Sequence, residues 1–138
     1  MLAKIIYKKP WFFPILQWFF PAANWDYTVV VFGRRIYTKH KLDLALYAHE
    51  YTHCEQQKLS WVWGLVWCIR YIFSPKFRFD QELEAYQIQF QVFSTRNHDR
   101  NAQNQYLHRL AKDLSGPLYK NLIDYESARK LIREIKKL

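Results

Sequence analysis

The sequence predicts a small, mostly helical α+β domain, in which a short β-hairpin near the N-terminus is followed by about four to five helices. Its 138 residues suffice for one hydrophobic core but not for two, so we expect residues 1–138 to form a single domain. Half of the residues are apolar and only three are glycine, which is typical of a compact fold rather than of disorder or repeats. One stretch has strand character, whereas apolar residues recur at helical spacing along most of the remaining chain.

The first 24 residues are aromatic and interrupted by prolines. We expect residues 1–24 to be irregular and to pack over one side of the domain. Lysines precede the apolar stretch 11–20, as in a signal peptide, but Pro14 and Gln17 interrupt that stretch. We therefore interpret it as part of the fold.

The rest of the chain is expected to form the hairpin and the helices. Strand-forming residues on both sides of the turn-like pair Gly33-Arg34 predict a hairpin over residues 27–38. Apolar periodicity and proline-containing stop signals predict helices over residues 41–58, 61–73, 79–94, 99–114 and 125–138. The helix over 61–73 is nearly continuous in apolar residues, so we expect it to be strongly buried. The stripe of the third helix comprises Phe79, Leu83, Tyr86, Phe90 and Phe93, and one side of the last carries Leu131, Ile135 and Leu138.

The net charge of +9 bears first on solubility, and it is also compatible with an acidic partner such as a phospholipid surface or a nucleic acid. An anionic membrane surface is one candidate, because all six tryptophans fall within residues 11–67 and the last predicted helix is basic. No apolar stretch reaches the roughly 18 residues that a membrane-spanning helix needs. A nucleic-acid partner is not expected, since the basic residues are scattered and their one cluster, residues 129–137, fits the solvated face of a helix.

The two cysteines, Cys54 and Cys68, are too few for a disulfide framework and lack the CxxC spacing of a metal site. We expect both to be reduced and partly buried. Reduced cysteines favour a cytoplasmic protein. The same cytoplasmic protein could also associate with a membrane surface.

Residues 49–53 read His-Glu-Tyr-Thr-His, an HExxH motif inside the predicted helix 41–58. Histidines four residues apart lie one above the other on a helix, so His49 and His53 can reach the same zinc ion. Glu50 follows the first histidine directly and can take a proton from a metal-activated water. We therefore predict one zinc ion, and we favour it over a chance match with two histidines merely buried in the core.

A third ligand is expected downstream, where Glu82 and Glu84 are the nearest carboxylates. At about 100° per residue, Glu82 lies roughly 60° from the centre of its helix's apolar stripe and Glu84 roughly 140° away. The helical phase therefore favours Glu82 as the ligand and Glu84 as a solvated residue. Among the other histidines, His40 and His98 are expected at the surface, and His108 is favoured less than Glu82.

The pattern resembles the gluzincin metallopeptidases, and in particular the very small minigluzincin-like proteins of bacteria and phages. The resemblance rests on residues 49–57, His-Glu-Tyr-Thr-His-Cys-Glu-Gln-Gln, and on residues 82–86, Glu-Leu-Glu-Ala-Tyr, within the central third to half of the chain. It implies a helical zincin core, with His49, His53 and Glu82 as ligands and Glu50 as general base. In many gluzincins, the position of Tyr86 holds an aspartate, and that aspartate orients a ligand histidine. A tyrosine hydroxyl can serve the same purpose.

The resemblance implies peptide-bond hydrolysis, as an endopeptidase more than as an exopeptidase. Glu50 would accept the proton of the attacking water, and a further side chain would donate to the oxyanion. The sequence offers several donors without choosing among them: Tyr106, His108, Tyr119 and Tyr125. The peptide or protein substrate is expected to lie along the hairpin as an added strand.

A second hypothesis is that the protein binds zinc but does not catalyse a reaction. In it, the protein is a catalytically silent zinc-binding module that associates with a membrane surface or a protein assembly. The tryptophans of the first half and the basic last helix favour this hypothesis. The activity of a Glu50 variant distinguishes the two.

Overall fold

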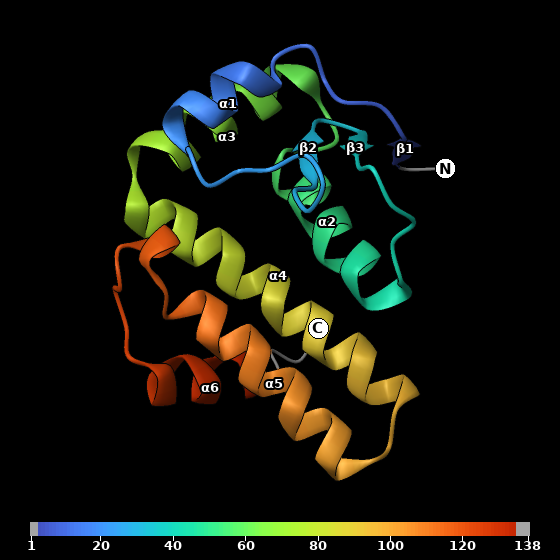
Figure 1. The fold of residues 1–138 in the computed structure, drawn as a ribbon, viewed down its shortest axis with the longest axis vertical. Helices are drawn as coiled ribbons and strands as arrows, with labels where there is room; N and C mark the ends of the chain where they lie inside the picture. Colours follow the sequence, from blue (N-terminus) through green and yellow to red (C-terminus); the bar gives the residue numbers. More distant parts are fainter. Residues whose placement is uncertain (1–2, 135–138) are drawn as a thin grey trace.

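The computed structural model describes residues 3–134, which form six α-helices and a three-stranded sheet (Figure 1). This confirms the predicted α+β, mostly helical class. The expected hairpin consists of the antiparallel strands β2 (Val30–Phe32) and β3 (Arg35–Tyr37). Gly33 opens its two-residue turn with φ of +61°, a conformation that glycine adopts without steric strain.

The N-terminal segment is more regular than the sequence predicted. Strand β1 (Lys4–Ile6) pairs in parallel with β3, so the strand order is β1-β3-β2. Helix α1 (Phe13–Phe19) follows, with Phe13 fully buried. The expectation of irregular structure was wrong for these residues. Pro14 occupies the first turn of α1, where a missing N–H group breaks no helical hydrogen bond, and β1 depends on a partner about 30 residues away.

Helices α2 (Leu44–Gln56) and α4 (Pro75–Arg96) make the most extensive helix contact in the described chain. Asp43 caps α2 by accepting a hydrogen bond from the backbone N–H of Leu46 at 2.8 Å. Ser74 caps α4, and Pro75 starts it, so α4 begins four residues earlier than predicted. The C-terminal end of α2 holds the hairpin turn, because the Gln57 side chain bonds the N–H of Gly33 and the carbonyl of Val31.

On its other side, α4 packs against α5 (Arg100–Leu114), α6 (Tyr125–Arg133) and the 3-10 turn η1 (Pro117–Tyr119). The larger core lies there, and the predicted stripe of α4, from Phe79 to Phe93, is packed in it. A smaller core joins the sheet to α2 around Ile36 and Cys54. The region of α2–α4 contact lies between the two cores. The predicted positions of Ile135 and Leu138 on the last helix fall outside the described residues.

Helix α3 (Trp61–Phe73) has the predicted bounds, but its predicted strong burial was wrong. Within it, only Gly64 and Trp67 are buried. One side of α3 faces α4 and β2, and α1 covers only part of the rest. Inside residues 3–134, no helix combines the length and the apolarity needed to cross a bilayer. Both cysteines are free, with Cys54 fully buried and Cys68 half-buried, as expected.

Candidate metal centre

Three buried side chains with metal-binding atoms meet where α2 contacts α4. His49 and His53 lie one turn apart on α2, and Glu82 faces them from α4. The Nε2 atom of His49 lies 3.1 Å from one carboxylate oxygen of Glu82, and Nε2 of His53 lies 3.4 Å from the other. All three ligand atoms are within 4.8 Å of one another. This group is close enough to hold a metal ion.

Glu82 and Glu84 occupy opposite sides of α4. Glu82 is only 6% exposed, whereas Glu84 lies in solvent. Two steps along a helix rotate the side chain by about 200°, so the two carboxylates cannot face the same way. The carboxylate chosen from helical phase is the one that lies beside the histidines.

The ring of His53 is held from its far side by Gln56. The amide oxygen of Gln56 lies 2.9 Å from Nδ1 of His53, and the amide nitrogen donates to the backbone carbonyl of Gln81 at 2.9 Å. Because that second bond fixes the amide orientation, Nδ1 of His53 is the donor of the first. The Nε2 atom therefore faces Glu82 and is the atom available to a metal. Gln56 belongs to the motif stretch, but its role was not predicted.

The buried side of α3 closes the site. The hydroxyl of Tyr71 donates to Glu82 at 2.6 Å, which positions the carboxylate. The Trp67 ring stacks on Tyr71 with centroids 4.8 Å apart and packs against the ring of His53 at 5.4 Å. Sequence reasoning missed both residues because it treated this helix as apolar core. Their spacing of four, which places both rings on one side of the helix, was the available signal.

Charges within the site compensate one another in the absence of a metal. Burial opposes the charge of Glu82, but attraction to His53 and hydrogen bonds from both histidines hold its pKa well below the ordinary 4.5. Burial likewise opposes a charged His53, yet the Glu82 carboxylate raises the pKa of His53 to about 9. The metal-free protein therefore holds a buried ion pair between these two side chains at neutral pH.

Glu50 lies on α2 next to the ligand group and is 8% exposed. Its burial raises the pKa of the carboxyl above the ordinary 4.5, and the neighbouring histidines only partly oppose this. A carboxylate with a raised pKa accepts a proton more readily near neutral pH. Glu50 thus has the position and the electrostatic environment of a base beside a metal ion.

Two of the predicted supporting residues, Tyr86 and Tyr119, reach this region. The Tyr86 ring packs edge-on against His49, with centroids 4.8 Å apart, and the Tyr119 hydroxyl lies close to that of Tyr86. Tyr86 does not orient His49 through a hydrogen bond, since no partner for the His49 Nδ1 atom lies within the described chain. Burial raises the pKa of Tyr119 well above the ordinary 10, so its hydroxyl stays protonated and can donate.

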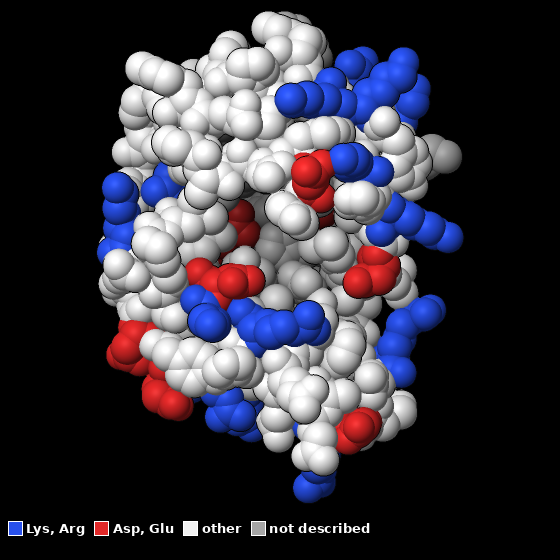
Figure 2. Space-filling model, in the orientation of Figure 1, with Lys and Arg blue, Asp and Glu red and all other residues white. Residues whose placement is uncertain are grey.

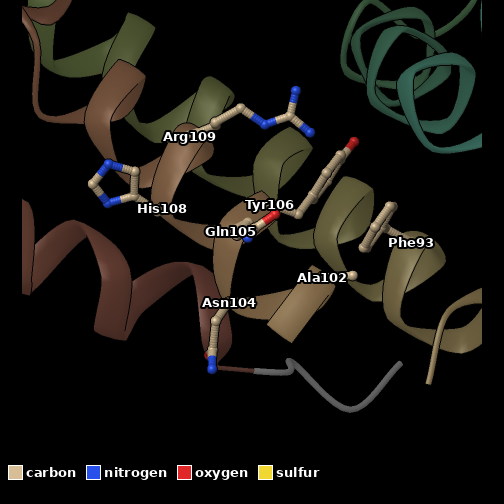
Figure 3. A pocket seen from close by; sticks show the side chains of 7 residues that line it. All are labelled: Phe93, Ala102, Asn104, Gln105, Tyr106, His108 and Arg109. Carbon is tan, nitrogen blue, oxygen red and sulfur yellow. The ribbon is translucent and has the colours of Figure 1, made fainter. Parts of the chain in front are cut away.

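The structure does not bring His108 and Tyr125 to the metal ligands. His108 is exposed, and its Nδ1 lies 2.6 Å from the Tyr125 hydroxyl, where α5 meets α6. Figure 3 shows His108 at a surface hollow over α5, pointing away from Tyr106 and Arg109. Tyr106 is buried in the larger core, where its hydroxyl accepts a hydrogen bond from the side-chain amide of Gln89 at 2.7 Å. These candidates failed because a side chain's direction relative to another helix is not encoded in its spacing.

No family model matches this chain, and no match is found among curated proteins or solved structures. What the α2–α4 contact can do chemically therefore follows from its own residues. Two imidazoles and a carboxylate can bind a metal ion, and a second buried carboxylate beside them can accept a proton. The arrangement suits hydrolysis by a metal-activated water.

Proposed function

We propose that this protein is a zinc-dependent peptidase of the gluzincin type, in which His49, His53 and Glu82 hold one zinc ion. The observation that supports this most strongly is the burial of Glu50 beside the three ligands. A purely structural metal site does not need Glu50, because this second buried carboxylate is not required to balance the charge of the Glu82–His53 ion pair. A general base needs that position.

The donor set fits zinc. Two imidazole nitrogens and one carboxylate are the three protein ligands of many catalytic zinc sites, whereas calcium and magnesium take mainly oxygen ligands. The Nε2 atoms of His49 and His53 lie 3.2 Å apart, so both lone pairs can be directed at one ion. When bound, zinc supplies a Lewis acid that lowers the pKa of a water molecule and polarises a carbonyl group.

The protein's own side chains supply the rest. Glu50 accepts the proton of the attacking water and passes it to the leaving amine. The pair Tyr86 and Tyr119 is the favoured donor to the oxyanion, because both hydroxyls lie near the ligands and stay protonated. Trp67 and Tyr71 keep water from the back of the site and hold Glu82 in position.

The substrate is proposed to be a peptide or an unfolded protein in extended form. In the described sheet, β2 pairs on one side only, and it packs on α2, which carries the two histidine ligands. An added strand along β2 would place a peptide bond beside the metal centre. An extended strand can continue in both directions, so this arrangement favours an endopeptidase.

A Glu50→Gln variant tests the proposal. It should retain one zinc ion per chain, and its cleavage of an unfolded protein should fall by at least about a hundredfold, the contribution of a general base. Glu55→Gln is the matched control, since Glu55 is exposed on the same helix. If zinc-loaded wild-type protein cleaves nothing in a broad peptide library, the silent zinc-binding module is the correct function.

A further inference from the structure

The exposed side of α3 is almost entirely apolar. At about 100° per residue, Gly64 and Trp67 lie on one side of the helix, and the exposed apolar residues cover the rest of its circumference. Each member of this group is 45–70% exposed: Trp61, Val62, Trp63, Leu65, Val66, Ile69 and Phe73. A surface helix normally turns its apolar stripe to the core and its polar side to solvent, whereas α3 is apolar nearly all round and exposes most of its apolar residues.

Helix α1 continues this surface. The rings of Phe19 and Phe73 lie 5.6 Å apart, so α1 lies against the C-terminal end of α3. On and just before α1, Trp11 is 85% exposed, Ile15 54% and Trp18 78%. Figure 2 shows a broad area without charged side chains over these two helices. We name this surface, formed by Trp11, Ile15, Trp18 and the exposed side of α3, the α1–α3 face.

The two segments that carry the α1–α3 face contain basic residues and no acidic ones. Residues 3–25 and 56–79 contain no aspartate or glutamate but seven lysines and arginines, of which only Arg78 is buried. Two exposed lysines lie against aromatic rings of the two helices, with the Lys9 ammonium 5.1 Å from the Phe13 centroid and the Lys58 ammonium 4.0 Å from that of Trp63. Positive charge therefore predominates along the two segments that form the apolar surface.

We propose that the α1–α3 face docks this protein onto an anionic bilayer surface, with α1 and α3 lying in the plane of the interface. Tryptophan rings concentrate at the boundary between headgroups and acyl chains, and four of the six tryptophans are on this face. The basic edge complements anionic headgroups. Helices of 7 and 13 residues are too short to span a bilayer, so the protein lies on the membrane.

Charge also argues against a second copy of the chain as the occupant. In a twofold dimer through this face, Lys9, Lys58 and Arg70 of one copy would lie opposite the same basic set of the other. Such like charges disfavour association. The docking does not depend on the metal centre, which lies on the other side of α3, where Trp67 and Tyr71 contact its ligands.

Vesicle binding by the full chain tests this proposal. The protein should float with vesicles of phosphatidylcholine mixed with phosphatidylserine, its tryptophan emission should shift to the blue, and high salt should weaken the binding. Leu65→Ser should lower the lipid partition coefficient about fivefold, as expected for losing part of a leucine side chain's transfer free energy. Leu44→Ser is the matched control, because Leu44 is 47% exposed on α2, compared with 51% for Leu65.

Two charge-reversal variants test the contribution of the basic residues. Lys58→Glu should reduce binding to the anionic vesicles, whereas Lys41→Glu, also at an exposed lysine, should leave it unchanged. The proposal is overturned if the wild type stays unbound, if it binds pure phosphatidylcholine equally well, or if the two leucine variants behave alike. It is also overturned if light scattering shows a dimer that Leu65→Ser dissociates, since the face would then be a self-interface.

Discussion

The α2–α4 contact and the α1–α3 face reverse the usual distribution of side chains in opposite ways. The contact buries His49, Glu50, His53 and Glu82, each less than 10% exposed, whereas the face exposes ten large apolar side chains. Burying charge and exposing apolar surface both lower the free energy of unfolding. Side chains that destabilise the folded state are expected at places where they serve a function. The two regions share α3. Its residues Trp67 and Tyr71 contact the ligands at the α2–α4 contact, and its exposed apolar side chains form part of the α1–α3 face.

The largest expected effect follows from removing the carboxylate of the metal centre. Glu82→Ala should lower zinc affinity by at least about a hundredfold, more than the loss of an outer-shell partner does. Glu84→Ala should leave it unchanged, because Glu84 faces solvent on the same helix. Competition with a chromophoric chelator measures both constants. Equal affinities for the two variants would show that the buried group does not bind the metal.

Metal binding should also depend on pH through His53. Its pKa of about 9 in the metal-free protein lies above the ordinary 6.5, so its proton must leave before Nε2 can bind zinc. We expect apparent zinc affinity to rise about tenfold per pH unit from pH 7 and to level off near pH 9. The same ion pair stabilises the metal-free fold fully between about pH 4.5, the ordinary pKa of Glu82, and pH 6.5, the ordinary pKa of His53. This stabilisation is lost in acid as Glu82 is protonated, and it is lost again as the pH rises through 9. Calorimetry in buffers of different ionisation enthalpy measures the released proton, and no release at pH 7.5 would contradict the pairing.

The two sides of α3 should respond differently to alanine. A Cβ at Gly64 would lie 2.7 Å from the amide oxygen of Gln57, whose side chain is pinned by the hairpin, and 3.1 Å from the backbone nitrogen of Gly33. Gly64→Ala should therefore lower the free energy of unfolding by about 1–3 kcal/mol. Leu65→Ala, on the exposed side, should change it by no more than about 0.5 kcal/mol. Chemical denaturation of the metal-free variants measures both, and similar losses would mean that α3 is buried on both sides.

The smallest effect is expected at the residue that joins α3 to the metal centre. Tyr71→Phe removes only the hydroxyl that positions Glu82, so zinc affinity should fall about tenfold with the fold unchanged. Tyr47→Phe is the control, because Tyr47 stacks on Tyr51 in the smaller core and does not contact the ligands in the described chain. If both variants bind zinc like the wild type, α3 shields the site without positioning its carboxylate.

Local periodicity explains which features the sequence revealed. The HExxH spacing and the phase of Glu82 depend on rotation about a single helix, which the sequence determines directly. The hairpin at Gly33 and the bounds of α3 follow from turn residues and a proline in the same way. The missed elements were non-local. Strand β1 requires β3 as a partner, and Gln56 acts through a carbonyl of α4.

The residue pattern alone predicted helices α2 to α6, the hairpin and a set of three metal-binding side chains facing the core. The packing of the helices set what surrounds these side chains: Tyr71 and Trp67 against the ligands, Tyr86 and Tyr119 nearby, and His108 directed elsewhere. It also set which part of the nearly all-apolar α3 is covered and which part is exposed, and a helix that is apolar on every side does not show this in its pattern. The physical reason is that a pattern defines the faces of a helix, whereas the packing of other helices determines which face is covered.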